Sequence, residues 1–514
     1  MTQELSKPAY SVSDTVYAWL SLLFAFLLCQ TVPVIQRPLG GFLLIVVLFI
    51  TGFVILRVKK RKVYPICILS AVSALVIGSA LLLTDTKFLI KLSLAYSLAS
   101  YCYFLYAAFG NRIEEGLSDY IYIDLIKILF IQPFRSFAAI FPALSNKSAE
   151  KGSRFLLKII IGIGIAIIPT ALAFGFLSYD SGFMKIIDNI FSFDSKNVGR
   201  TIRSLIFALP LAMYGFGLYA SSLKKVLHSK MTAESCKAGL AKAKILPQLT
   251  AVVAVLPILF LYVIFFISQW KYYVSGFTGV LPENFSYAEY ARQGFFELCS
   301  VSVINLILII SIAFFIKPGK KGKPVILKIV TTLFCLCTLI LISTAVAKLV
   351  MYIDYYGLTP KRIYAMWLMV LIGIVFLLVA LGQYLRKFKT VAICFAVAII
   401  LFAGLSVCNV NALCSRYNAD RYLAGTLDTI DVKAMDKLGD SAIPALVQVA
   451  TSMNEQKDRP LKQQIDEILQ SRAEEIQKEK FSIFSLSVPS LRARSALKDY
   501  APNLPQNGAP QDSV

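Results

Sequence analysis

Long runs of apolar residues dominate the chain from residue 15 to residue 409 and predict membrane-spanning helices. Runs of about 20 apolar residues match the hydrocarbon core of a bilayer, and backbone groups inside that core must be hydrogen-bonded within a helix. We expect an all-α, polytopic transmembrane helical bundle over residues 1–409. Its eleven expected spans are 15–35, 39–56, 63–83, 88–109, 155–177, 201–223, 245–269, 294–316, 325–350, 363–382 and 390–409.

One apolar stretch between the fourth and fifth spans carries a polar pattern. Residues 120–142 are rich in Ile, Leu and Phe, but Asp124, Lys127 and Arg135 recur near helical spacing. Such a polar face predicts an amphipathic segment that lies in the plane of the cytoplasmic membrane surface. Pro133 should divide this segment into two helical pieces.

The apolar runs end at residue 409, and the tail has a different pattern. Short helical patterns at residues 410–485 predict a small helical extracytoplasmic domain. Its first helix should begin with Asn418 as the cap and end at Gly425. Residues 486–514 end in a stretch rich in Pro, Asn and Gln, and we expect this last segment to be disordered.

The composition fits a membrane protein, because 57% of the 514 residues are hydrophobic and 16% are charged. The formal net charge of +22 invites a nucleic-acid interpretation until the charges are located. Connections after even-numbered spans hold 24 basic and six acidic residues, whereas those after odd-numbered spans hold nine and seven. Lys and Arg accumulate in cytoplasmic loops. The N-terminus is therefore predicted to be cytoplasmic and the tail extracytoplasmic, although a miscount of one span would move the tail inside.

The charge distribution also predicts the partners. The excess of basic residues in the cytoplasmic loops is an orientation signal and an attraction for anionic lipid headgroups. We expect the lipid bilayer to be the main partner, with anionic lipids at the cytoplasmic loops and no nucleic acid. The chain offers no basis for naming a protein partner.

The residue inventory argues against most catalytic chemistry. The single histidine, His228, has Glu234 as its only acidic neighbour in the sequence, and no phosphate-binding loop motif is present. The ten cysteines form no C-x-x-C motif, and of these Cys408 and Cys414 are near the extracytoplasmic surface, where oxidation is possible. We therefore expect no catalytic residue, no metal site and no cofactor, and we favour a protein that is not an enzyme.

The eighth span carries the best candidates for a substrate or ion site. Glu297 is the only acidic residue within a predicted span, and Asn305 follows eight residues later. Charges inside a membrane suggest function, so Glu297 and Asn305 are predicted to form a polar stripe that faces protein or water. Just before this span, Glu289 and Arg292 are three residues apart and can pair on one helical face. A structural alternative makes Glu297 an interhelical anchor, and its possible partners are Lys91, Arg203 and Lys348.

The loop after the ninth span is a second candidate. Thr359 can cap the following helix with Pro360 at its first position. Asp354 and Arg362 are close enough in sequence to pair across this short loop. We expect these residues to form a structural cap between two spans.

Several of these motifs resemble those of a bacterial multi-pass membrane family grouped as domain of unknown function 4153/4173. The most specific block is YAEYAR at 287–292 followed by GFFEL at 294–298. The other stretches are 132–134, 281–283, 304–306, 356–359, 362, 364–365, 411–413 and 416–418. The resemblance covers about residues 60–450 and implies a multi-pass protein of the bacterial cytoplasmic (inner) membrane, but it implies no activity.

Three functions agree with this sequence. The first is a transporter or permease-like protein with a polar site on the eighth span. The second is a non-catalytic membrane scaffold or sensor. The third is a membrane-embedded transferase that acts on a lipid-linked substrate. A water-filled cavity at Glu297 and Asn305 would favour the first or third function, whereas a dry interhelical contact would favour the second.

Overall fold

The computed structural model describes a helical protein, as the sequence predicted. No β-strand occurs among the residues that it describes. These residues are 10–30, 37–116, 118–144, 177, 195–224, 233–268, 287–317, 325–385, 388–453, 459–478 and 482–500.

Ten helical segments are long and apolar enough to cross a membrane. They correspond to ten of the eleven predicted spans; the span predicted at 155–177 falls outside the described residues, apart from Leu177. The segments are formed by α1 (Val12–Gln30), α2 (Pro38–Val58), α3 (Pro65–Gly78) with α4 (Ala80–Leu83), α5 (Lys87–Ala108), α11 (Ser195–Leu223), α13 (Gln248–Ser268), α15 (Tyr287–Phe315), α16 (Val325–Tyr356), α17 (Pro360–Gly382) and α18 (Thr390–Val407). A short helix, α12 (Ala233–Ala243), precedes α13.

These helices expose apolar surface instead of hiding it. On α13, Leu249, Phe260 and Ile267 are more than 60% exposed, whereas Ala251 and Val255 face the protein. A soluble helix that exposed such a surface would aggregate, but in a bilayer the same side chains contact lipid. The exposed apolar faces therefore support the membrane location.

The segment after α5 is broken into short helical pieces. They are α6 (Ile121–Ile126), a π-helical turn η2 (Lys127–Ile131), α7 (Gln132–Arg135), a 3-10 turn η3 (Phe137–Ala139) and α8 (Ile140–Leu144). The pieces 121–135 and 137–144 meet at an angle of 53°. A π turn is one of the adjustments by which a helix accommodates a nearby proline. The predicted division in two is present, but the bend follows Arg135 instead of falling at Pro133.

Two of the three charged residues of this segment, Asp124 and Lys127, point inward. Asp124 and Lys127 are each 1% exposed, whereas the apolar Ile126 and Phe130 are exposed. The Tyr106 hydroxyl donates a hydrogen bond to Asp124 over 2.6 Å. Arg135, the third charged residue of the expected face, is exposed. By length and composition the two pieces together pass as a broken span or a re-entrant segment, and the in-plane placement of residues 120–142 stays a prediction.

The chain divides into two compact units. The first comprises Met1–Gly78, Leu94–Ile113 and Tyr122–Lys230, and the second comprises Ser79–Ser93, Glu114–Ile121 and Met231–Val514. In the first unit α1 packs against α11. Asp14 of α1 accepts a hydrogen bond from the Tyr219 hydroxyl over 2.6 Å and forms an ion pair with Lys59 at 2.7 Å.

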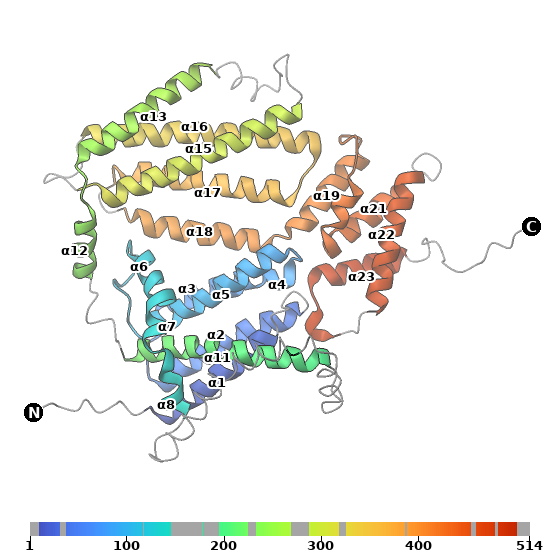
Figure 1. Cartoon of the computed structure of the whole chain (residues 1–514). Helices are drawn as coiled ribbons and strands as arrows, with labels where there is room; N and C mark the ends of the chain where they lie inside the picture. The colour runs from blue at the N-terminus through green and yellow to red at the C-terminus, as the bar shows by residue number, and fades with distance from the viewer. Residues whose placement is uncertain are drawn as a thin grey trace, which may run out of the picture. The chain divides into compact units, whose positions relative to one another are not determined.

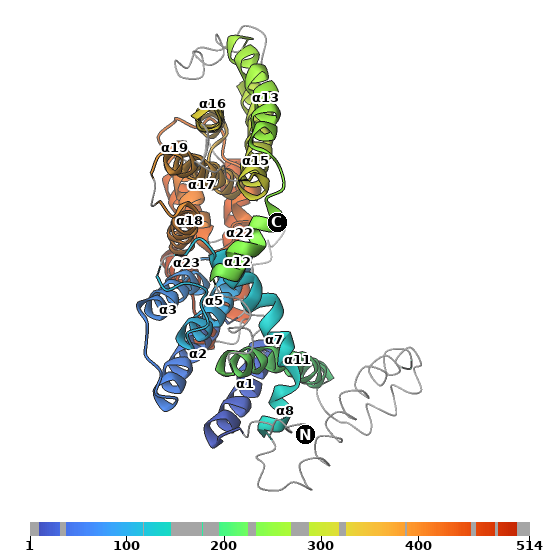
Figure 2. The same cartoon turned by 90° about the vertical axis from the view of Figure 1, so that its left-hand side faces the viewer.

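In the second unit the spans form a sequential array. Helix α16 packs against α13, α15 and α17, and α17 packs against α18. The four helices α15 to α18 lie side by side (Figure 1). Figure 2 looks nearly along the axes of α16, α17 and α18, so these three helices run roughly parallel.

A compact helical domain follows α18 at one end of this array (orange to red in Figure 1). It consists of α19 (Val410–Leu423), α20 (Val432–Asp436), η4 (Gly439–Ala442), α21 (Ile443–Ser452), α22 (Arg459–Lys478), η5 (Ile483–Ser485) and α23 (Val488–Tyr500). Leu446, Val449, Ile465 and Leu469 form the centre of its core and are fully buried. We call residues 410–500 the C-terminal domain.

Two expectations for the tail need correction. Helix α23 lies within residues 486–514, which were expected to be disordered, and it buries Ala493, Leu497 and Tyr500 in the core of the domain. Residues 501–514 lie outside the described residues. Helix α19 begins eight residues before Asn418, because the Asn409 side chain caps it by accepting from the Ala412 amide. Its predicted end is confirmed, since Gly425 follows it with a φ of +69°.

Candidate functional site

Asn305 of the eighth predicted span lies in a dry contact between three helices. Its side chain is 1% exposed. The Tyr262 hydroxyl of α13 donates to Asn305 Oδ1 over 2.6 Å, and Asn305 Nδ2 donates to Thr338 Oγ1 of α16 over 2.9 Å. The amide is thus bonded to protein on both sides, which is how polar side chains join helices in a membrane.

Glu297 occupies a different environment from Asn305. Its side chain is exposed, so the two residues do not form the predicted stripe in a single environment. Of its possible anchors, Lys348 interacts electrostatically with it. Lys348 is buried against Gly294, where a side-chain carbon would collide with the lysine Nζ. Glycine at this position therefore makes the room for the lysine.

Glu289 and Arg292 are the other two residues of this candidate site. Helix α15 begins at Tyr287 and so includes Glu289 and Arg292, but their side chains lie outside the described part of the structure. Their role as substrate- or ion-binding residues stays a prediction.

The loop before α17 has the predicted N-cap backbone, but its acidic residue pairs with a different arginine from the one predicted. Thr359 occupies the N-cap position with Pro360 next, but its side chain makes no capping hydrogen bond. Asp354 pairs with Arg421 of α19 at 3.7 Å instead of with Arg362. The Arg362 guanidinium donates to the Gly357 carbonyl and stacks 4.0 Å from the centroid of the Tyr352 ring.

The C-terminal domain is hydrogen-bonded to this loop through Asn418. The Asn418 side chain accepts from the Leu358 amide over 2.6 Å and donates to the Leu358 carbonyl over 2.9 Å. Gly357 has a φ of +77°, and a side chain there would collide with Asn418. We call the two hydrogen bonds between Asn418 and Leu358 the Asn418 clasp. The local sequence around Asn418 does not reveal this role.

A second contact joins the domain to the loop between α4 and α5. Asp85, the only acidic residue in that loop, is partly buried and accepts from Asn411 Nδ2 over 2.8 Å and from the Ser441 amide over 3.0 Å. Burial raises the pKa of Asp85, and the hydrogen bonds from Ser441 and Asn411 oppose this rise. Gly439 approaches the same carboxylate with a φ of +70°. We call Asp85 with Asn411, Gly439 and Ser441 the docking contact.

Sequence reasoning missed the docking contact because its partners are more than 300 residues apart. The one available signal was an isolated acidic residue in a three-residue connection, Thr84–Asp85–Thr86, between two helices. In the sequence, Asn411 stood out only as part of a stretch, 411–413, that resembles the family.

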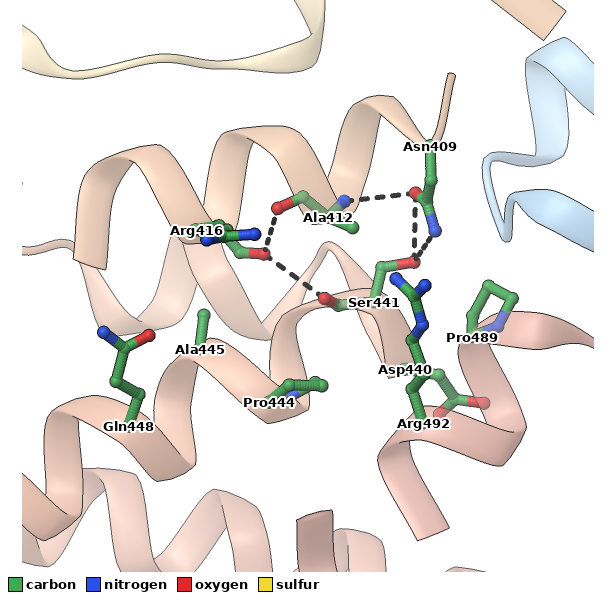
Figure 3. Close-up of a pocket in the computed structure, with 11 residues that line it drawn as sticks. Asn409, Ala412, Arg416, Asp440, Ser441, Pro444, Ala445, Gln448, Pro489 and Arg492 are labelled. Atoms are coloured by element: carbon green, nitrogen blue, oxygen red, sulfur yellow. Dashed lines mark hydrogen bonds between the residues drawn. The ribbon is translucent and has the colours of Figure 1, made fainter. Parts of the chain in front are cut away.

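A pocket of about 260 Å³, lined by both polar and apolar side chains, lies within the C-terminal domain, close to the docking contact (Figure 3). Ser441 hydrogen-bonds to Asn409 there at 2.9 Å. The acidic residue of the lining, Asp440, is held by Arg472, whose Nε donates over 2.7 Å. The eleven residues that line the pocket are Asn409, Ala412, Ser415, Arg416, Asp440, Ser441, Pro444, Ala445, Gln448, Pro489 and Arg492.

Two further groups of residues concern redox and metal chemistry. Cys408 and Cys414 are both free thiols, the first exposed and the second buried. Burial raises the pKa of Cys414 to about 12, so its reactive thiolate form is suppressed. Within the described ranges, no three His, Cys, Asp or Glu residues gather in a geometry that would hold a metal ion.

Replacement of Asn305 by alanine should destabilise the membrane bundle by about 1 kcal/mol, because Tyr262 and Thr338 each lose a hydrogen bond. Thermal unfolding of the purified protein in detergent measures this effect. Ser311→Ala is the matched control, since the Ser311 hydroxyl lies on the same helix and donates to the Ile307 carbonyl of that helix. Equal melting temperatures for the two variants would show that the Asn305 contact does not hold the helices together.

Two glycines of the C-terminal domain provide a paired test of the docking contact. Gly425 and Gly439 both have a positive φ, but an added Cβ meets nothing at Gly425 and approaches Asp85 Oδ2 to 3.0 Å at Gly439. Both alanine variants carry the same backbone strain, so Gly439→Ala should be less stable by a further amount on the order of 1 kcal/mol. Heat-dependent proteolysis of the full chain measures the difference, and equal losses would contradict the contact.

The chain was compared with known proteins. The family model described as domain of unknown function (DUF4153) matches residues 67–449. No match was found among the curated proteins or among the solved structures. The matched region includes the eighth span, the docking contact and most of the pocket. It confirms the resemblance seen in the sequence, and the chain belongs to the DUF4153 family of multi-pass membrane proteins.

Proposed function

We propose that the protein is a non-catalytic membrane scaffold that holds its C-terminal domain rigidly at the extracytoplasmic surface. The observation that carries this proposal is the docking contact, in which Asp85 accepts two hydrogen bonds from the C-terminal domain. Hydrogen bonds to charged groups each contribute about 1.5–3 kcal/mol when well placed. Such a contact is expected where a domain must keep one position.

Three more contacts support a fixed position for the domain. The Asn418 clasp holds the loop before α17, and Arg421 donates to the Asp354 carbonyl over 2.8 Å. Helix α23 also packs against α4 at the end of the third predicted span. A tethered but mobile domain would need none of these contacts, because the covalent link at residue 409 would suffice.

The environment of the eighth span also favours a scaffold over a transporter at that position. Asn305 has both of its polar groups bonded within a helix contact, so it is used for packing. A transport site there would need these groups to be free for a solute or an ion. The topology predicted from eleven spans, with Ile121–Leu144 re-entrant and not crossing, directs the C-terminal domain outward.

Replacement of Asp85 by alanine should release the C-terminal domain from the span ends. The loss of two charge-assisted hydrogen bonds should raise the rate of trypsin cleavage within the domain at least about tenfold. Limited proteolysis of the full-length protein in detergent or nanodiscs measures this rate. Asp436→Ala is the control, because Asp436 is an exposed aspartate of the same domain. Equal cleavage of wild type and Asp85→Ala would reject a held domain.

Transport is a second candidate function, and the broken segment Ile121–Leu144 favours it. Lys127, the first residue of its π turn, and Asp124, in the preceding helix α6, are both buried. The lysine Nζ lies 5.8 Å from the centroid of the Tyr106 ring. Interrupted helices with charged residues at membrane depth form the ion and substrate sites of many transporters. The first compact unit would then carry the transport site in place of the eighth span.

A proton-flux assay tests the second candidate. Proteoliposomes that contain a pH-sensitive dye and a potassium diffusion potential should acidify several times faster with wild type than with Asp124→Asn, since the variant lacks the carboxylate. Asp428→Asn, at an exposed position of the C-terminal domain, is the control. Wild-type flux no greater than that of empty liposomes would remove proton-linked transport from consideration.

A further inference from the structure

We propose that the pocket of the C-terminal domain binds a phosphate group, presented by an anionic phospholipid headgroup or by a soluble phosphate ester. The proposal rests on the proposed scaffold function, because the docking contact keeps the pocket at the membrane surface. It gives the held domain a specific partner.

The position of the pocket is the first argument. Asn409, at one end of the lining, comes two residues after Val407, the last residue of α18. Ser441, also in the lining, donates its amide to Asp85 in the short connection between α4 and α5. The pocket therefore adjoins two span ends at once. Headgroups occupy the layer about 5–8 Å thick next to the hydrocarbon core, so its floor lies at their level.

The charge of the lining is the second argument. Arg416 on α19 and Arg492 on α23 come from different helices and are both exposed, so their guanidinium groups are accessible to a ligand (Figure 3). The acid of the lining, Asp440, is already paired with Arg472. Arg416 lies 3.6 Å from Asp420 in an exposed pair. Such pairs contribute about 0–1 kcal/mol, so a phosphate can displace this partner.

The chemistry and size of the pocket are the third argument. Guanidinium groups bind phosphate through two parallel hydrogen bonds. The lining also holds the Ser441 hydroxyl and the Asn409 amide, which bond to each other, and the Gln448 amide, which bonds to Asp420. The two arginines therefore supply the contacts to the phosphate. A volume of about 260 Å³ is below the about 300–1,000 Å³ typical of sites for drug-sized molecules. The pocket is suited to a headgroup or a small ester and not to a large solute.

The test is native mass spectrometry of the detergent-solubilised full chain titrated with phosphatidylglycerol, and with phosphatidylcholine for comparison. Wild type should bind the first phosphatidylglycerol more tightly. The double variant Arg416→Gln/Arg492→Gln should weaken this binding at least about tenfold, since two charge-assisted contacts are lost. Arg416→Lys/Arg492→Lys keeps the charge and should recover part of the affinity.

The matched control removes the same charge elsewhere on the domain. Lys433→Gln/Arg459→Gln changes two exposed basic residues that do not line the pocket, and it should leave the affinity unchanged. Calorimetric titration with inorganic phosphate distinguishes the two sources. Arginine-dependent binding of phosphatidylglycerol alone supports a lipid headgroup, whereas arginine-dependent binding of inorganic phosphate as well supports a soluble ester.

The proposal is overturned if the Arg416→Gln/Arg492→Gln variant binds phosphatidylglycerol and inorganic phosphate as wild type does. It is also overturned if the control variant weakens binding equally, because the effect would then be general surface charge. Trypsin resistance of the double variant shows in the same samples whether the domain stays docked. A docked domain without specific phosphate binding rejects this inference and leaves the scaffold function standing, whereas an undocked wild-type domain rejects the scaffold function.

Discussion

One partly buried carboxylate, that of Asp85, connects the membrane spans of the second unit to the C-terminal domain. It lies in a three-residue connection between two helices, where the backbone has little freedom, and it accepts hydrogen bonds from Asn411 and the Ser441 amide. Burial of a carboxylate is unfavourable unless its oxygens are hydrogen-bonded. The domain supplies these bonds, so the position of η4 and α19 depends on the carboxylate, and the pocket between them depends on η4 and α19.

The same rule explains the polar residues inside the membrane part. Asn305 bonds to Tyr262 and Thr338, and the buried Asp124 accepts from Tyr106. In each case a polar group that would be costly in lipid joins helices that are near one another along the chain. Asn305 and Asp124 therefore have a structural use before any functional one.

The spans could be predicted from the sequence because their signal is local. An apolar run such as that of α18 needs no knowledge of its neighbours, and the bilayer dictates its length and helical form. The C-terminal domain was harder to predict. Helix α23 was missed because the Pro/Asn/Gln-rich end of the chain obscured the helical spacing of Ala493, Leu497 and Tyr500. These three residues are four and three apart, which was the available signal.

The candidate site could be predicted only in part because its partners are distant. Asp354 was expected to pair with Arg362, eight residues away, but the structure pairs it with Arg421. Asn418 has the residue type of a helix cap and is instead a clasp on Leu358. Local rules assign a polar residue to its sequence neighbours, and they fail where a folded domain brings a better partner.

Hydrogen–deuterium exchange at the Ser441 amide tests the central claim most directly. This amide lies in the 3-10 turn η4 and donates to Asp85, so its exchange reports on the docking contact. In the full-length protein, peptides that contain Ser441 should be protected, and Asp85→Ala should abolish the protection while the core peptides of α21 and α22 stay protected. Rapid exchange at Ser441 in wild type, or unchanged protection in Asp85→Ala, would contradict the account.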